Sequence, residues 1–352
     1  MQSRPTSVIV AAVAAMISVN AAQAGGLKQV GEISIPGEPI TDIGIMAIDQ
    51  ATGLGYLADK SNRSVDIFDT KTGKYVSRVP GFMGRTKDGD VAGPNGIVVV
   101  KGEVWASDGD STIKVIDTKT GAVTATISTG GKKRGNGMAH AENIGVVIVA
   151  NSNDDPPYMS LISTADRKIL AKIPIPESAE NLERSIYHQP SGMFYTAIPV
   201  SKADPTKGLM AQIDPKSGKL VKLHELPCHP HSLSLASDAT IFLGCSTAHG
   251  PSSKPGGDMA IFDIAGGKVE SILPGYGGNG GSTVNPRLGQ YYHSTSGGVL
   301  MVVDTKTKQG LQQIKTSRGA RSVAVGPDDR VYVAVNAKDQ PCPGCVVVYA
   351  PE

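Results

Sequence analysis

The chain has 352 residues, of which 34 are Lys or Arg and 32 are Asp or Glu, so its formal net charge is only +2. Near-neutrality argues against a dedicated nucleic-acid-binding protein, which would need a strongly basic face. Aromatic residues make up only 5% of the chain, so stacking platforms for bases or sugars are scarce.

The first residues have the pattern of a secretory signal peptide. Arg4 precedes an apolar run from Val8 to Val19, and Ala22-Gln23-Ala24 then supplies the small residues of a cleavage site. The run is shorter than the roughly 20 residues of a membrane-spanning helix, although an uncleaved anchor is the alternative. We expect cleavage after Ala24, which leaves residues 25–352 as one periplasmic or secreted domain without a membrane span.

One motif of alternating apolar residues occurs seven times along the chain. Its clearest copy is Ile113–Thr118, and the other six begin at Val65, Met159, Met210, Met259, Leu300 and Val346. Alternation with a period of two is typical of a half-buried strand. Because the copies recur every 40–50 residues or so, they predict a β-propeller with one four-stranded sheet per blade.

The two ends of the chain complement each other. Leu27–Pro36 has the pattern of an outer strand with no blade before it, and Val346–Ala350 that of a third strand with no fourth strand after it. We therefore predict an all-β, seven-bladed β-propeller of four-stranded antiparallel blades, closed by the N-terminal strand completing the C-terminal blade. Such closure removes free sheet edges.

Two stretches, Gly102–Gly130 and Arg321–Asn336, resemble the YVTN-type propeller repeat. The resemblance covers essentially all of residues 25–352 and fades in blades three to five, where the loops are longer. The eponymous tetrapeptide is absent, and its nearest version is Tyr332-Val333-Ala334-Val335. The resemblance implies an exported or surface propeller. Related propellers include lactonases, a metal-dependent antibiotic lyase and the large subunits of periplasmic amine dehydrogenases, so the fold alone does not select a function.

The loops around one end of the central channel would carry the ligand-binding residues. Their amide, carboxylate, imidazole and guanidinium groups are supplied by Asp42, Asn95, Asn136, Glu180, Arg184, His229, His231, His249, His293, Arg318 and Arg321. The same loops contain further basic residues, including the run Lys132-Lys133-Arg134, and together they would attract an anion. The alternative is that these residues serve only the turns of their own loops.

Two subsets also have the chemistry of a divalent cation site. One offers the oxygen ligands that calcium or magnesium requires, from Asp42, Asn95, Asn136 and Glu180. The other offers imidazoles for zinc or copper, or for a general base, from His229, His231 and His293. Two of these histidines flank Pro230, so they would point the same way only if the proline permits it.

The four cysteines predict two disulfides. Cys228 precedes the inner strand of blade five and Cys245 ends the second strand, so antiparallel pairing would bring their sulfurs together. Cys342 and Cys345 form a C-x-x-C pair in a loop, where a structural disulfide is expected. The alternative, thiol–disulfide exchange, normally uses such a pair at the start of a helix.

Three functional hypotheses remain open at this stage. No G-x-S-x-G elbow, P-loop or complete calcium-binding loop is present. The first hypothesis is a monomeric periplasmic binding or scaffold protein for a small anionic ligand or a partner protein. The second is a metal-dependent lactonase or lyase with its cation (Ca, Mg or Zn) at the channel mouth. The third is a propeller subunit of a periplasmic redox enzyme.

Overall fold

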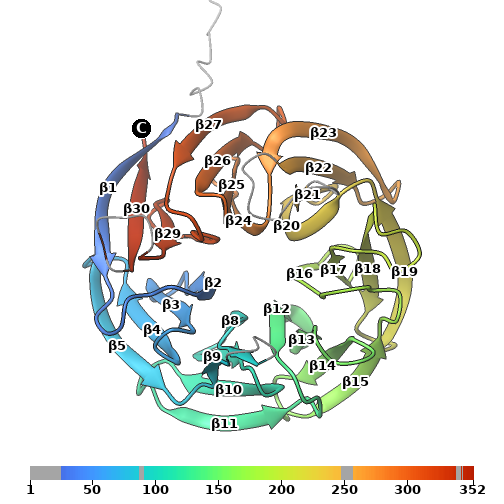
Figure 1. Cartoon of the computed structure of the whole chain (residues 1–352), viewed down its shortest axis with the longest axis horizontal. Coiled ribbons are helices and arrows are strands. Elements are labelled where there is room, and N and C mark those ends of the chain that lie inside the picture. Colours follow the sequence, from blue (N-terminus) through green and yellow to red (C-terminus); the bar gives the residue numbers. More distant parts are fainter. Residues whose placement is uncertain (1–24, 87–90, 247–256, 338–341, 343) are drawn as a thin grey trace, which may run out of the picture.

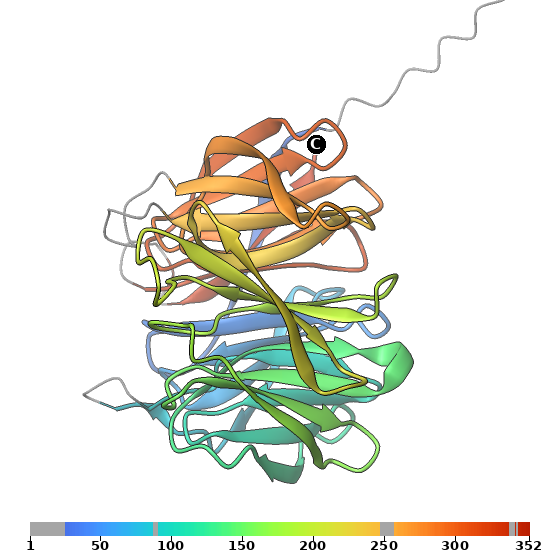
Figure 2. The ribbon, with the colours of Figure 1, turned by 90° about the vertical axis from the view of Figure 1, so that its right-hand side faces the viewer.

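Seven four-stranded antiparallel sheets form a ring around a central channel (Figure 1). This computed structural model describes residues 25–86, 91–246, 257–337, 342 and 344–352, so the expected signal peptide lies outside the described residues. Viewed from the side, the ring is a disc that is thinner along the channel than across the blades (Figure 2). The prediction of a seven-bladed β-propeller is confirmed. No helix in the described ranges is long and apolar enough to cross a membrane.

The blades follow one another along the chain, each running from the channel outwards. Blade one contains β2 (Ile43–Ile48), β3 (Leu54–Asp59), β4 (Ser64–Asp69) and β5 (Lys74–Pro80). Blade two contains β8 (Ile97–Val100), β9 (Glu103–Ser107), β10 (Thr112–Asp117) and β11 (Val123–Ser128). Blade three contains β12 (Gly135–Ala141), β13 (Val146–Asn151), β14 (Tyr158–Ser163) and β15 (Ile169–Pro174). Blade four contains β16 (Ser185–His188), β17 (Met193–Ile198), β18 (Gly208–Asp214) and β19 (Lys219–Leu226).

The remaining blades complete the ring. Blade five contains β20 (His229–Ser237), β21 (Thr240–Ser246), β22 (Gly257–Asp263) and β23 (Lys268–Gly277). Blade six contains β24 (Gly280–Asn285), β25 (Gln290–Thr295), β26 (Val299–Asp304) and β27 (Gly310–Lys315). Blade seven contains β28 (Ser322–Val325), β29 (Val331–Val335), β30 (Cys345–Pro351) and β1 (Leu27–Ser34). A two-residue hairpin, β6 (Gly84–Arg85) with β7 (Ala92–Gly93), and the short 3-10 helix η1 (Glu142–Ile144) lie in connections.

The recurring motif forms the third strand of every blade, and both faces of this strand pack against a neighbouring blade. In β10, Ile113 and Val115 are fully buried beside Trp105 of the adjacent strand β9. The turn that follows is fixed by Asp117, whose Oδ1 accepts hydrogen bonds from the backbone N–H groups of Lys119 and Thr120. The motif thus specifies both a buried strand and the turn that follows it.

The closure predicted from the two chain ends is confirmed. β1 pairs antiparallel with β30, from Leu27 opposite Pro351 to Ser34 opposite Cys345. In Figure 1 the two strands lie side by side at the upper left, β1 in blue and β30 in red. Ile33 of β1 is 2% exposed and packs into the core between blades seven and one. The first described strand is therefore an integral layer of the last blade.

Both predicted disulfides are present, and all four cysteines are paired. Cys228 bonds Cys245 across the start of β20 and the end of β21, with their Cα atoms 5.7 Å apart. Cys342 bonds Cys345 at the start of β30, beside the closing strand. The first disulfide therefore lies on the same end of the ring as the candidate ligand-binding loops.

Candidate functional site

A small polar cavity lies at the mouth of the channel, where the inner strands begin. Its volume is about 70 Å³, enough for a few water molecules or one small polyatomic ion and well below the roughly 300–1,000 Å³ of drug-sized ligand pockets. Its polar walls include the side chains of Lys60, Asn95, Arg134, Asn136, Glu183, Arg184 and Arg321. The loops chosen from the sequence therefore do converge on one cavity.

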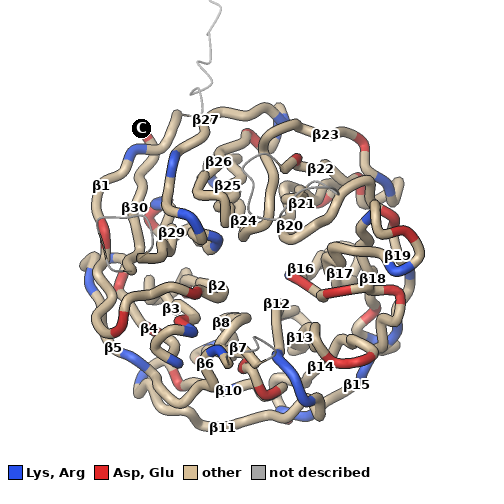
Figure 3. The backbone as a smooth tube through the Cα atoms, in the orientation of Figure 1, with Lys and Arg blue, Asp and Glu red and all other residues tan. Residues whose placement is uncertain are grey.

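Four basic side chains from four different blades line this cavity. Lys60 follows β3 of blade one, Arg134 precedes β12 of blade three, Arg184 precedes β16 of blade four, and Arg321 precedes β28 of blade seven. Figure 3 shows basic positions at the inner end of blade seven, beside β24. Among the described residues, the negative charges that oppose them are Glu183 in the cavity wall and the neighbouring Asp42. Four formal positive charges against two negative ones leave the site cationic.

Asp42 is held by three of the surrounding cations. Its Oδ1 lies 3.2 Å from Lys60 Nζ and 3.1 Å from Arg321 Nη2. Its Oδ2 lies 2.9 Å from Arg85 Nη1. Burial alone would raise the pKa of Asp42, but Lys60, Arg321 and Arg85 lower it below its ordinary value. The carboxylate is therefore ionised and already engaged, so it does not offer the free oxygens that a calcium or magnesium site would need.

Lys60 is the most deeply buried cation of the group. Its side chain is 3% exposed. Burial, together with repulsion from Arg321, lowers the pKa of Lys60 to about 7 in spite of the Asp42 carboxylate. Lys60 therefore changes its charge near neutral pH, and the charge of the cavity changes with it.

The cations Arg134 and Arg184 have neutral partners. Arg134 donates from Nε to Asn153 Oδ1 at 2.8 Å and from Nη2 to Asn181 Oδ1 at 3.1 Å. Arg184 Nη2 donates to the backbone carbonyl of Arg321 at 3.3 Å. Burial lowers the pKa of both guanidinium groups, to about 10 for Arg184, so both stay charged at neutral pH. Across the described residues, no carboxylate forms an ion pair with either of them.

The two candidate asparagines connect neighbouring blades. Asn95 is 3% exposed, and its Nδ2 donates to the carbonyls of Ala92 and Gly135. Asn136 Nδ2 donates to the carbonyl of Leu182 at 2.9 Å. Their amide groups line the cavity, and they also fix the loops that carry the arginines.

The structure changes which acidic and basic residues belong to the site. Glu180 is exposed and does not line the cavity; the carboxylate that does is Glu183, three residues later. Arg318 is also exposed and lies outside the cavity wall, whereas Arg321 is part of it. Lys60 and Glu183 were missed from the sequence. Their position could have identified them, since each lies in a channel-facing loop next to an inner or second strand.

Among the described residues, the candidate histidines do not lie close enough together to appear as one group of potential metal ligands. His229 Nε2 bonds the carbonyl of Pro205 at 3.0 Å. His293 is fully buried, with Nε2 bonded to the Gly278 carbonyl at 3.2 Å, and burial lowers its pKa to about 4. The described part of the chain gathers only one group of potential metal ligands, Glu32 with the disulfide-bonded Cys342 and Cys345. His249 lies outside the described residues.

A second pocket, of about 370 Å³, adjoins the cavity on the side of blades seven and one. The two share Ile43 and Arg321, and the second pocket adds Thr41, Asp42 and Arg85. An anionic group in the small cavity would thus have room beside it for the body of an organic ligand.

Comparison with known proteins extends only to the fold. No protein-family model matches the chain, and no curated protein matches its sequence. Among solved structures, the chain is similar to one described as Kuenenia stuttgartiensis hydrazine synthase, with a TM-score of 0.72, 15% sequence identity and coverage of 90% of this chain and 97% of that chain. At such low identity the likeness shows the propeller fold alone. The resemblance to YVTN-type repeats is not matched by any family model.

Proposed function

We propose that this protein binds a small anion, or the anionic group of a larger ligand, at the mouth of the propeller channel. The supporting observation is the convergence of Lys60, Arg134, Arg184 and Arg321 on one cavity, with no carboxylate of the described residues in an ion pair with Arg134 or Arg184. Removing a cation from water costs several kcal/mol unless an opposite charge compensates it. A bound anion would supply that compensation.

The chemistry of the cavity favours an oxyanion such as a carboxylate, phosphate or sulfate group. Guanidinium groups present planar, paired donors that match two oxygens of such a group, and hydrogen bonds of this type are stronger than those between neutral partners. The 70 Å³ cavity fits the anionic group, and the adjoining pocket of 370 Å³ fits the remainder of the ligand. A small organic acid or acidic ester is the ligand class that uses both spaces.

Isothermal titration calorimetry at low ionic strength tests this proposal with sulfate, phosphate and oxalate as probes. Arg184→Gln should weaken binding by roughly 10- to 100-fold, because a hydrogen bond to a charged group contributes about 1.5–3 kcal/mol. Arg287→Gln is the matched control, since this arginine pairs with Asp329 at 2.8 Å outside the cavity. Equal affinities in both variants, or no binding by the unchanged protein, would contradict the proposal.

The exported location is also a proposal, supported by the two disulfides, since these persist in oxidising compartments. Mass spectrometry of protein recovered from a bacterial periplasm should give a chain that begins at Gly25. A monomer is expected from size-exclusion chromatography with light scattering. A chain that retains residues 1–24 would overturn the cleavage site.

The alternative of a redox-enzyme subunit is favoured by the similarity to the hydrazine synthase chain. It predicts stable co-purification with a cofactor-bearing partner, which the anion-binding proposal does not require. The metal-dependent lactonase or lyase alternative predicts about one firmly held divalent ion per chain, which elemental analysis of untagged protein would detect. Neither outcome is expected from the anion-binding proposal.

A further inference from the structure

His231 owes its position to a β-bulge. In the pairing of β20 with β21, Pro230 lies opposite Cys245 and Ser232 lies opposite Gly244, so His231 is an additional residue without a partner. Bulges re-aim side chains and are common beside active sites. As a result His229 and His231 point apart, the first to the Pro205 carbonyl and the second to Ser246.

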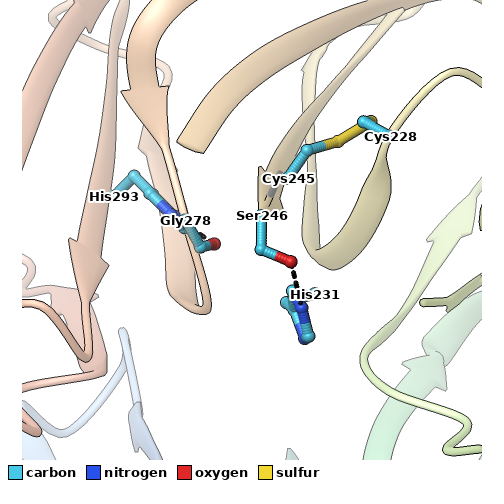
Figure 4. Close-up of a disulfide and its surroundings, with 6 residues drawn as sticks. All are labelled: Cys228, His231, Cys245, Ser246, Gly278 and His293. Carbon is cyan, nitrogen blue, oxygen red and sulfur yellow. Dashed lines mark hydrogen bonds between the residues drawn. A yellow bond between two sulfur atoms is a disulfide. The ribbon is translucent and has the colours of Figure 1, made fainter. Parts of the chain in front are cut away.

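Ser246, His231 and Glu183 form a continuous line. Ser246 Oγ lies 2.9 Å from His231 Nε2, and His231 Nδ1 lies 4.0 Å from Glu183 Oε1. Figure 4 shows the imidazole on the channel side of Ser246, with the Cys228–Cys245 disulfide on the other side. Since Glu183 lines the cationic cavity, the serine hydroxyl lies one imidazole ring away from the proposed anion site.

The imidazole has the surroundings of a general base. His231 Nδ1 is buried and has no hydrogen-bond partner among the described residues, although it faces the Glu183 carboxylate. A proton on Nδ1 would point at that carboxylate and leave Nε2 to accept the proton of Ser246. Burial lowers the pKa of His231 below its ordinary value, against the opposing effect of Glu183, which favours the unprotonated ring that can accept a proton. Contacts of this kind shorten when a substrate is bound.

Other serine–histidine contacts in the protein lack these features. His188 Nδ1 lies 2.8 Å from Ser191 Oγ, but its Nε2 is held by the carbonyl of Asp238 at 2.9 Å. His293 is likewise held by a backbone carbonyl and is fully buried. A carbonyl fixes a ring but does not stabilise an imidazolium as a carboxylate does, so of these three described histidines His231 has the partner that nucleophilic catalysis needs.

We propose that Ser246, His231 and Glu183 form a hydrolytic site for an ester or lactone that carries an anionic group. This inference rests on the proposed function, because Arg184 and Arg321 would hold the anionic group while the ester carbonyl faces Ser246. The disulfide fixes Cys245, the neighbour of Ser246, to the residue that precedes β20. It thereby keeps the serine and the bulged histidine in register.

The reaction would proceed in two balanced steps. Ser246 Oγ attacks the carbonyl carbon, its proton passes to His231 Nε2, and the ester C–O bond breaks as that proton is delivered to the leaving alcohol oxygen. Water then attacks the acyl-serine, gives one proton to His231 Nε2, and releases the carboxylic acid while the proton returns to Ser246. Ester and water thus give an acid and an alcohol, or one hydroxy acid from a lactone. Glu183 acts as a positioning residue that stabilises the imidazolium.

Covalent labelling and ester hydrolysis test this site in the full-length mature protein. A fluorophosphonate probe should phosphonylate Ser246, as located by peptide mass spectrometry, and Ser246→Ala should abolish the labelling. His231→Gln should slow it by roughly 100-fold or more, the range for loss of a general base. Glu183→Gln removes the charge that raises the pKa of His231, so it should shift the pH profile of labelling to lower pH and lower its plateau. Ser191→Ala is the matched control and should label as the unchanged protein does.

Two esters define the substrate class: p-nitrophenyl acetate, which is neutral, and mono-p-nitrophenyl succinate, which carries a carboxylate. Preferential hydrolysis of the succinate that is lost in Ser246→Ala supports the proposal. Sulfate binding without labelling or hydrolysis would overturn the hydrolytic site and leave the anion site standing. Labelling of Ser246 without sulfate binding or a preference for the succinate would overturn the anion site instead.

Discussion

The buried Lys60 predicts that anion binding depends on pH around neutrality. Its pKa of about 7 means that the amine is charged below this pH and neutral above it. The groups that surround it are Asp42, Arg321 and Arg134. Asp42 and the arginines keep their charges in this range, so the charge of the cavity falls by one as Lys60 loses its proton. Affinity for an anion should be highest below pH 7 and should fall as the pH rises.

The size of the effect follows from the titration of one group. Lys60 is protonated in roughly 90% of molecules at pH 6 and in roughly 10% at pH 8 if its pKa is about 7. Two unit charges about 4 Å apart interact by about 4 kcal/mol near a protein surface, so the anion strongly prefers the protonated form. The apparent affinity should therefore fall about tenfold between pH 6 and pH 8, which equals about 1.4 kcal/mol.

Calorimetric titration with sulfate measures this dependence, because sulfate stays doubly charged throughout the range. Binding should also take up about half a proton per site at pH 7, which appears as a dependence of the heat on the ionisation enthalpy of the buffer. Lys60→Met should bind more weakly at pH 6 and show a flat profile to pH 8. A flat profile in the unchanged protein, or an unchanged slope in the variant, would refute the assignment of the titration to Lys60.

Three further predictions concern stability. Replacing Cys228 and Cys245 by Ser should lower the free energy of unfolding by about 3 kcal/mol, since the disulfide closes a separation of 17 residues. Urea denaturation measures this difference, and an unchanged free energy of unfolding would show that the disulfide does not constrain the unfolded chain. The same change at Cys342 and Cys345, three residues apart, should cost only about 2 kcal/mol, and a larger loss than for the first pair would contradict this order. Ile33→Ala should cost about 2–5 kcal/mol, because it leaves a cavity under the closing strand, and an unchanged denaturation midpoint would argue against closure by β1.

The fold could be predicted because its determinants are local and repeated. The motif at Ile113–Thr118 specifies burial by alternation of apolar residues and a turn by the Asp that ends the strand, and this Asp is present in five of the seven blades. The closing strand could be predicted because Leu27–Pro36 and Val346–Ala350 each have the pattern of a strand that lacks a neighbour, and β1 and β30 do pair. The Cys228–Cys245 disulfide follows from strand adjacency, and the Cys342–Cys345 disulfide from the C-x-x-C spacing in a loop.

The site could be predicted only in part, because its residues meet across the channel rather than along the chain. Arg184, Arg321 and the two cavity asparagines occupy loops that the repeat places at one end of the ring. Lys60 and Glu183 occupy similar positions without any local pattern to mark them. The bulge at His231 is a register shift, which alternation of side chains does not reveal. No motif search finds a serine, a histidine and a glutamate that come from three separate blade segments.

The pairing of β1 with β30 has a consequence for how the protein is made. Leu27 and Pro351 are 324 residues apart in the sequence, yet they are partners in one ladder. Each of the first six blades can form from consecutive residues, but the seventh lacks its outer strand until β1 pairs with β30. Any interrupted product therefore carries two open sheet edges, on which unrelated strands can add. Closure of the ring therefore requires that both β1 and β30 have been synthesised.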